Sequence, residues 1–193
     1  MKISLDSRIL ASLVTARGEG LSPTPGFRPA SVSLLVFEKS EPHLLAIQKA
    51  DTEGYPWRNQ VALPGGHQDD DDPTAMATAL RELEEELSIP PAQVEMLGSL
   101  GRFQTIAMRE VEAFLGIWAG TGPVCYETAE IARVLEIPLS TIIATHIERR
   151  YRGRMPDVRE LVYPYRDVVI WGLTAKIVHR FIERLLPAVG APD

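Results

Sequence analysis

Two kinds of hydrophobic pattern run along the chain, and the first predicts strands. Apolar and β-branched runs predict a pair of strands over 30–37 (ASVSLLVF) and 43–48 (HLLAIQ), joined by the turn EKSEP. A polar loop at 49–60 then leads to the short strand VAL at 61–63. The same pattern predicts further strands over 93–103, 109–120, 133–139 and 159–165.

The second pattern has apolar residues three and four positions apart, which predicts helices. One helix starts near Pro73, which suits the first helical position, with Asp72 as the N-cap. The others cover 139–147 and, as a closing amphipathic helix, 168–186. Because strands and helices do not alternate regularly, we expect an α+β fold with a mixed, curved sheet. We expect one domain over 1–193, with residues 1–29 as an N-terminal extension.

The helix after Pro73 contains the acidic stretch LRELEEEL, residues 80–87. At 3.6 residues per turn, its three leucines fall on one side, and Glu82, Glu85 and Glu86 converge on the opposite side. Like charges at these spacings destabilise a helix by roughly 0.2–0.5 kcal/mol per pair, and no lysine within the stretch relieves the repulsion. The stretch is therefore either a solvated acidic face or a cation site, and these eight residues leave both open.

Composition narrows the class of protein. A formal net charge of −6 argues against a nucleic-acid partner, so an anionic substrate would need a metal ion as mediator. The single cysteine, Cys125, rules out an internal disulfide framework and suits a reducing compartment, and we expect it in the core. The absence of an 18-residue apolar run and of a signal-peptide pattern at the N-terminus predicts a cytoplasmic protein without a membrane span.

The residues around the acidic stretch form a longer pattern: Gly66, then Asp72, then Arg81-Glu82-Leu83-x-Glu85-Glu86-x-Ser88-Ile89. The pattern resembles the signature of the Nudix hydrolases, which hydrolyse a nucleoside diphosphate linked to another group and use magnesium or manganese. The loop to Arg81 is one residue longer than in that signature. Asp72 stands for the usual glutamate and Ser88 for the closing glycine. The resemblance implies a Nudix-type α/β/α sandwich with the Nudix box at 64–89.

The resemblance also implies roles for individual residues. Glu82, Glu85 and Glu86 would be metal ligands and catalytic residues, because carboxylates suit Mg²⁺ or Mn²⁺, and the Gly65 carbonyl would be a further ligand. A fourth catalytic glutamate, a metal ligand or general base, would come from a later loop. Glu130 is the better match and Glu127 the second, and the alternative is an acidic loop residue without a role.

Two further features are candidates for substrate binding. The segment RRYRGRMPDVR, 149–159, is rich in arginine, whose planar guanidinium suits phosphate, so Arg149, Arg150 and Arg152 are candidates. The alternative is a solvent-exposed hairpin. Trp57 either lines a pocket or covers the core. His67 and His146 lack any spacing that would suggest a zinc site. Arg81 is expected to hold the glutamate helix against the preceding loop.

Three stretches resemble the coenzyme A diphosphatase branch: QVALPGG at 60–66, EIARVLEIPL at 130–139 and WGLTAKIV at 171–178. Tyr55 and Asn59 depart from that branch, which has arginine and glycine there. The implied substrate is coenzyme A or a derivative. ADP-ribose, NADH, a dinucleotide polyphosphate or a nucleoside triphosphate are alternative substrates, and a Nudix-fold nucleotide-binding module is the non-enzymatic alternative. The expected partner is a small nucleotide, and a homodimer is left open.

Overall fold

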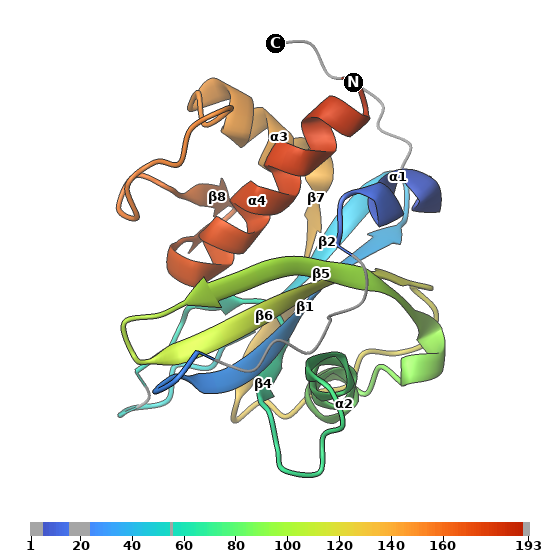
Figure 1. Cartoon of the computed structure of the whole chain (residues 1–193), viewed down its shortest axis with the longest axis vertical. Helices are drawn as coiled ribbons and strands as arrows, with labels where there is room; N and C mark the ends of the chain where they lie inside the picture. Colours follow the sequence, from blue (N-terminus) through green and yellow to red (C-terminus); the bar gives the residue numbers. More distant parts are fainter. Residues whose placement is uncertain (1–5, 16–23, 55, 191–193) are drawn as a thin grey trace.

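A mixed sheet forms the centre of the molecule (Figure 1), whose computed structural model describes residues 6–15, 24–54 and 56–190. Within this described part, seven strands follow the order β3-β2-β1-β6-β5, with β4 paired to β1 and β7 paired to β2. The strands are β1 (Arg28–Glu38), β2 (Pro42–Lys49), β3 (Val61–Ala62), β4 (Gly65–His67), β5 (Val94–Gln104), β6 (Arg109–Trp118) and β7 (Ile131–Pro138). The pair β1–β6 is parallel and the others are antiparallel, which confirms a mixed sheet in an α+β fold.

Helices cover both faces of this sheet. Helix α2 (Ala75–Leu87) lies on one face, and α3 (Leu139–Glu148) and α4 (Gly172–Ala188) lie on the other (Figure 1). The alternation of side chains along β1 explains the two layers, since successive residues of a strand point to opposite faces. Leu35 packs in a core cluster with Leu83 of α2, whereas Leu34 packs in a second cluster with Phe181 of α4.

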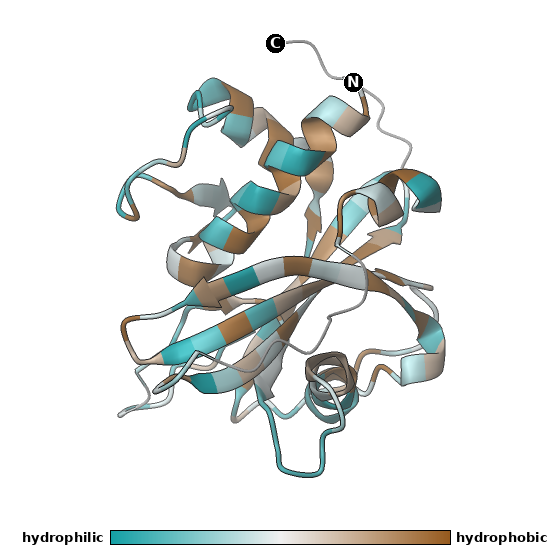
Figure 2. Cartoon of the chain, viewed as in Figure 1, coloured by the Kyte–Doolittle hydropathy of each residue, from teal (hydrophilic) through white to brown (hydrophobic). Residues whose placement is uncertain are grey.

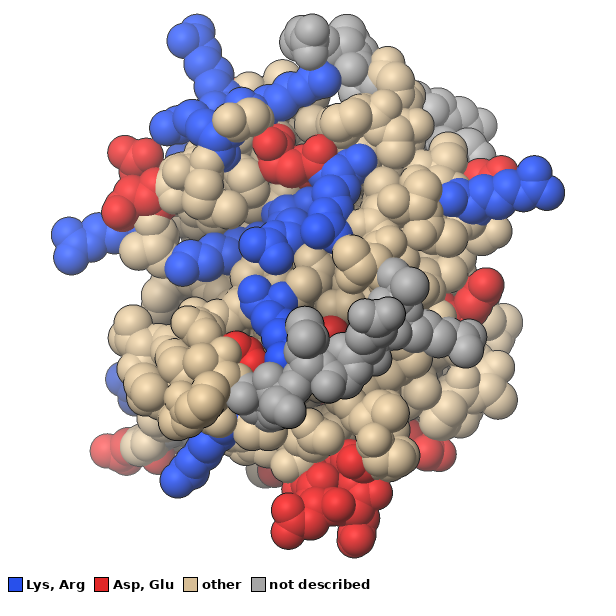
Figure 3. Space-filling model, viewed as in Figure 1, with Lys and Arg blue, Asp and Glu red and all other residues tan. Residues whose placement is uncertain are grey.

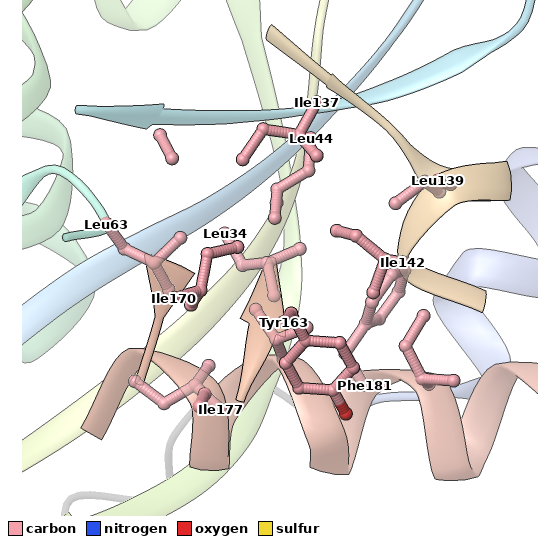
Figure 4. Close-up of a cluster of buried hydrophobic side chains, with 14 of the residues drawn as sticks. Leu34, Leu44, Leu63, Ile137, Leu139, Ile142, Tyr163, Ile170, Ile177 and Phe181 are labelled. Atoms are coloured by element: carbon pink, nitrogen blue, oxygen red, sulfur yellow. The ribbon is translucent and has the colours of Figure 1, made fainter. Parts of the chain in front are cut away.

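The larger cluster joins α3 and α4 to the sheet. Figure 4 shows Leu34 and Leu44 of the sheet beside Ile142, Ile177 and Phe181 of the two helices. One side of α4 is apolar and faces this core, while its outer side is polar (Figure 2), as the periodicity of the sequence predicts. Among the helices of the described residues, none is both long and apolar enough to cross a membrane.

Helix α2 begins and ends at residues that the sequence only partly predicts. Thr74 is the N-cap and its side chain accepts a hydrogen bond from the amide of Ala77, so the prediction of Asp72 as the cap is wrong. Asp72 instead accepts hydrogen bonds from Arg81. At the other end, Ser88 adopts a left-handed conformation (φ 53°), which places it where the signature has glycine.

Four short elements were not predicted. Within the expected extension 1–29, residues Ser7–Ser12 form the helix α1, while 1–5 and 16–23 lie outside the described residues. Gly65–His67, expected as a backbone break, pairs with β1 as β4, and Pro91–Gln93 form the 3-10 helix η1. Strand β9 (Val168–Ile170) pairs with β8 (Tyr163–Tyr165), which lies within the strand predicted over 159–165, so α4 starts four residues later than predicted.

Candidate active site

The acidic side of α2 faces β4, and Glu86 lies at this contact. Its Oε1 is 2.7 Å from Nζ of Lys49, and its Oε2 accepts a hydrogen bond of 2.9 Å from the Gly65 amide. Only 10% of the Glu86 side chain is exposed. A largely buried carboxylate is thus held by one cation and one backbone donor, which satisfy its charge.

Glu82 lies beside the second glycine of β4. A side chain at Gly66 would meet the Glu82 carboxyl carbon at 2.5 Å, so only glycine allows this approach. Burial is the largest effect on Glu82 and raises the pKa of its carboxyl, while the neighbouring carboxylates of Glu86 and Glu85 act in the same direction. The hydrogen bond from Arg81 opposes this rise. The site therefore gathers negative charge that a divalent cation would relieve.

Arg81 connects α2 to the loop that precedes it, as its predicted structural role requires. Its Nε and Nη2 donate to the two carboxylate oxygens of Asp72 at 3.1 and 3.0 Å, and Nη2 also donates to the His67 carbonyl at 2.9 Å. Its Nη1 donates to Glu82 and, at 2.7 Å, to Glu85. The hydrogen bonds from Arg81 lower the pKa of Asp72 to about 2. One guanidinium thus fixes the loop and orients two of the three candidate ligands.

The donor set of this site fits a hard divalent cation. Glu82, Glu85 and Glu86 offer carboxylate oxygens from adjacent turns of one helix, and such ligands, together with waters and phosphate oxygens, are those that Mg²⁺ takes. The Glu85 side chain is exposed, so the site opens to solvent on that side. Gly65 lies in the site through its amide, which donates to Glu86. Figure 3 shows acidic side chains over the adjoining β4–α2 loop, and Asp69, Asp70 and Asp71 there are exposed.

Glu130 and Glu127 lie in the turn that leads into β7. The Glu130 amide donates to the Glu127 carbonyl, and the Glu130 carbonyl accepts from Ala50, the residue that follows Lys49. This backbone contact brings the turn beside the strand end that holds Glu86. Both glutamate side chains are exposed. Cys125, a few residues earlier, is also exposed, so its predicted place in the core is wrong.

The loop between β2 and β3 carries Trp57, whereas Tyr55 lies outside the described residues. Backbone hydrogen bonds close this loop, from Asn59 to the Lys49 carbonyl and from Lys49 to the Gln60 carbonyl. Trp57 is 37% exposed, so part of its ring lies at the surface. Lys49 therefore links the base of this loop to the carboxylates, although sequence periodicity did not mark it as part of the site.

The arginine-rich segment lies in the other layer. Arg149 follows α3, Arg150 and Arg152 continue into the loop, and α3 packs on the sheet face opposite α2. The segment forms turns, and the hairpin of this region comes later, at β8–β9. The structure thus brings the three glutamates, Gly65 and the Trp57 loop together and leaves the arginines apart from them.

A pocket of about 440 Å³ extends along the outer edge of β7. Its lining combines aromatic rings, Trp118, Tyr126 and Tyr165 among them, with the cations Lys39 and Arg133. Residues of the 119–130 loop, which also carries Glu127 and Glu130, form part of its wall. Sequence patterns could not reveal this pocket, because its residues come from four separate parts of the chain.

The chain matches the NUDIX domain model over residues 27–158. It is 33% identical over 162 residues, 82% of this chain and 85% of the relative, to the uncharacterized Nudix hydrolase NudL of Photorhabdus laumondii. The corresponding protein of Yersinia pestis is 32% identical over 160 residues, 82% of this chain and 80% of the relative.

Solved structures share the fold. The NUDIX domain of Shewanella oneidensis NrtR, complexed with ADP ribose, has a TM-score of 0.56 and 16% identity, and covers 94% of this chain and 99% of its own. A MutT/nudix family protein from Enterococcus faecalis has a TM-score of 0.57 and 14% identity, and covers 89% and 71%. The signature around α2, the family model and the NudL relatives agree: the chain belongs to the Nudix hydrolase family, whose members act on diphosphate bonds and generally use divalent metal ions.

Proposed function

We propose that this Nudix hydrolase cleaves the diphosphate bond of coenzyme A or a derivative, with Mg²⁺ or Mn²⁺ held by Glu82, Glu85 and Glu86. The observation that carries the metal assignment is the approach of Glu82 and Glu86 to Gly66 and Gly65. When bound, a divalent ion neutralises phosphate charge and lowers the pKa of a coordinated water. The oxygen ligands on α2 match this chemistry.

In this proposal, residues of the protein orient the metal-binding carboxylates and accept the proton of the attacking water. Arg81 holds Glu82 and Glu85 in place, and Lys49 offsets the charge of Glu86. Glu130 is the proposed general base, with Glu127 as the second candidate, because their turn lies against the residue after Lys49. The proton that leaves the attacking water would pass to this carboxylate, and no covalent intermediate with the protein is required.

The coenzyme A assignment rests on three stretches that also meet in space. Thr174, in WGLTAKIV, donates a hydrogen bond of 3.0 Å to the carbonyl of Val61, in QVALPGG. Strand β2 pairs with both β3 and β7, and β7 contains most of the stretch EIARVLEIPL. The stretches that resemble the coenzyme A branch thus form one contiguous part of the molecule.

Activity on a substrate panel tests the proposal. Coenzyme A, its 3′-dephospho form, ADP-ribose, NADH, a diadenosine polyphosphate and nucleoside triphosphates are each incubated with enzyme and Mg²⁺, and the products are separated by chromatography. We expect coenzyme A to give 3′,5′-ADP and 4′-phosphopantetheine at the highest rate. A clear preference for ADP-ribose or a triphosphate would leave the hydrolase assignment standing and reject coenzyme A as the substrate.

The metal ligands are tested with a matched pair of variants. E86Q keeps the size of the side chain and removes one charge from the site, whereas E84Q makes the same change at the neighbouring exposed position on α2. We expect E86Q to lose activity by orders of magnitude at saturating Mg²⁺ and E84Q to retain it. Equal turnover in the two variants would overturn the assignment of Glu86.

Recognition of the 3′-phosphate is a separate question. Arg149, Arg150 and Arg152 are proposed partners for a phosphate far from the scissile bond, in keeping with their place outside the α2 face. A charge-assisted contact would contribute about 1.5–3 kcal/mol, or roughly tenfold to a hundredfold in preference for coenzyme A over its 3′-dephospho form. Equal rates on both would remove the arginine segment from the substrate site.

A further inference from the structure

A second cluster of metal-binding side chains lies on the sheet face opposite α2. His146 comes from α3, and His179 and Glu183 come from α4. One ligand atom from each residue lies within 4.8 Å of the other two. His146 is fully buried and His179 is 3% exposed, while 25% of the Glu183 side chain reaches solvent. The cluster is thus enclosed by the two helices and open at one side.

Each histidine uses one ring nitrogen to contact an oxygen of the surrounding protein. Nδ1 of His146 lies 2.9 Å from the Tyr163 hydroxyl, and Nε2 of His179 lies 2.9 Å from the Arg154 carbonyl. Because a carbonyl can only accept, Nε2 of His179 carries the proton and its Nδ1 carries a lone pair. Histidines that bind metals commonly have this arrangement, since an oxygen partner of the outer nitrogen fixes the ring and leaves the other nitrogen free to coordinate.

The other two ring nitrogens, Nε2 of His146 and Nδ1 of His179, differ in their hydrogen bonding. Nε2 of His146 lies 2.8 Å from Oε1 of Glu183. Nδ1 of His179 is buried and has no hydrogen-bond partner among the residues that the structure describes. A buried acceptor without a partner costs free energy, about 1–3 kcal/mol in proteins, and a ligand that accepts its lone pair would recover that cost.

We propose that His146, His179 and Glu183 form a zinc-binding site, separate from the carboxylates of α2. Two imidazoles and one carboxylate with a water in the fourth position form a common Zn²⁺ donor set. Tetrahedral coordination at about 2.0–2.1 Å places ligand atoms about 3.3 Å apart. The present separations, from 2.8 Å to no more than 4.8 Å, bracket that value, so side-chain adjustments suffice.

A metal at this position would fasten the arginine-rich segment to the helices. The second carboxylate oxygen of Glu183 accepts a hydrogen bond of 2.8 Å from the Gly153 amide, and His179 donates to the Arg154 carbonyl. Both contacts come from the segment 149–159 and involve two of the three proposed ligands. Zinc would therefore reduce the mobility of this segment, whereas Mg²⁺ at α2 would not affect it.

Zinc binding by the whole, metal-free protein tests the proposal. The wild type and E86Q are titrated with Zn²⁺ by calorimetry and with Co²⁺ by visible absorption, in which tetrahedral nitrogen and oxygen ligands give a characteristic band. We expect E86Q to retain one tight Zn²⁺ site and the Co²⁺ band. We also expect slower hydrogen exchange over 149–159 when Zn²⁺ is added.

Variants of the ligands complete the test. E183Q changes a partly exposed residue and preserves an acceptor for Gly153, so it should fold, and H179Q serves as a second variant. We expect both to lose the tight site and the Co²⁺ band, while the exposed-histidine control H67Q keeps them. Zinc binding that survives in E183Q and H179Q, or that disappears in E86Q, would overturn the proposal.

Discussion

Glu86 and Lys49 form a buried ion pair, with 2.7 Å between Oε1 and Nζ and only 10% and 14% of the two side chains exposed. The protein thus supplies its own cation to a carboxylate that is a proposed metal ligand. Because Lys49 is the last residue of β2 and Glu86 lies on α2, the pair also joins the two elements. Metal binding at Glu86 should therefore compete with this contact.

Removal of the lysine charge should make the fold more dependent on metal. In K49M without metal, Glu86 loses its cation and keeps the hydrogen bond from the Gly65 amide, and the loss of one partner by a buried charged group costs about 1–3 kcal/mol. We expect a lower melting temperature in EDTA and a larger rise on addition of Mg²⁺, since a ligand that binds only the folded state stabilises it. Thermal unfolding with and without Mg²⁺ measures both effects.

K39M is the matched control, because Lys39 pairs with Glu136 at a position where both side chains are well exposed. Exposed pairs contribute only about 0–1 kcal/mol, so K39M should change neither the melting temperature in EDTA nor the response to Mg²⁺ by much. An equal response in K49M and K39M would contradict a role for Lys49 in the metal site.

The two glycines of β4 should respond differently to alanine. In G65A, the new Cβ would meet the Ser31 carbonyl oxygen at 2.2 Å, and the φ of 146° disfavours any side chain. In G66A, the Cβ would meet the carboxyl group of Glu82, the movable end of a side chain, at 2.5 Å. We expect G65A to lose stability strongly and G66A to lose activity with a smaller loss of stability. Urea unfolding and steady-state rates distinguish them, and the reverse order would contradict the proposed place of Glu82.

Asp72 should contribute stability that acid removes. Its pKa is lowered to about 2 from an ordinary 3.8, so the stabilisation is present above about pH 4 and disappears as the pH falls toward 2. The difference corresponds to at most about 2.4 kcal/mol. We expect D72N to be less stable than the wild type at pH 6, and the gap to close by pH 2. A gap that stays constant in urea unfolding from pH 6 to 2 would show that charge is not the cause.

A glycine at Ser88 should stabilise the protein. Ser88 has φ 53° at the end of α2, a conformation that costs a side-chain-bearing residue about 1–2 kcal/mol, partly offset by the greater entropy of an unfolded glycine. We expect S88G to raise the free energy of unfolding by about 0.5–1 kcal/mol. The control A144G, at an exposed interior position of α3, should lower it by about 1 kcal/mol. Loss of stability in both variants would reject the strain at Ser88.

Much of the fold and the acidic site could be predicted because local patterns determine them. The continuous apolar run of β1 reflects burial on both faces of the sheet, and the spacing of Leu83 and Leu87 reflects burial on one face of α2, so the sequence reports both directly. Strand β9 was not predicted, because Val168–Ile170 is a short apolar run that fits a strand or the start of a helix. Asp72 and Thr74 are both residue types that favour the N-cap position. The Asp72 carboxylate accepts hydrogen bonds from Arg81, and Thr74 caps the helix.

Contacts between distant residues could not be predicted from these patterns. Lys49 and Glu86 are 37 positions apart in the sequence, and so are His146 and Glu183. No local spacing therefore predicts either pair. Cys125 was expected in the core because free cysteines are usually buried, but the loop after β6 leaves it on the surface. These positions depend on how the layers pack rather than on any one segment.

Arg81 contacts two separate points of the β4–α2 loop, and these contacts affect how the loop can vary in length. Its guanidinium holds the His67 carbonyl at one end and the Asp72 carboxylate at the other, while Asp70 and Asp71 between them are exposed. A residue inserted between His67 and Asp72 would lengthen this exposed bulge, because Arg81 holds both of those residues, whereas the extra residue relative to the signature lies between Asp72 and Arg81. Asp72, although shorter than the glutamate of the signature, still accepts hydrogen bonds from the Arg81 guanidinium with both carboxylate oxygens. What the loop must preserve is a distance in space rather than a number of residues.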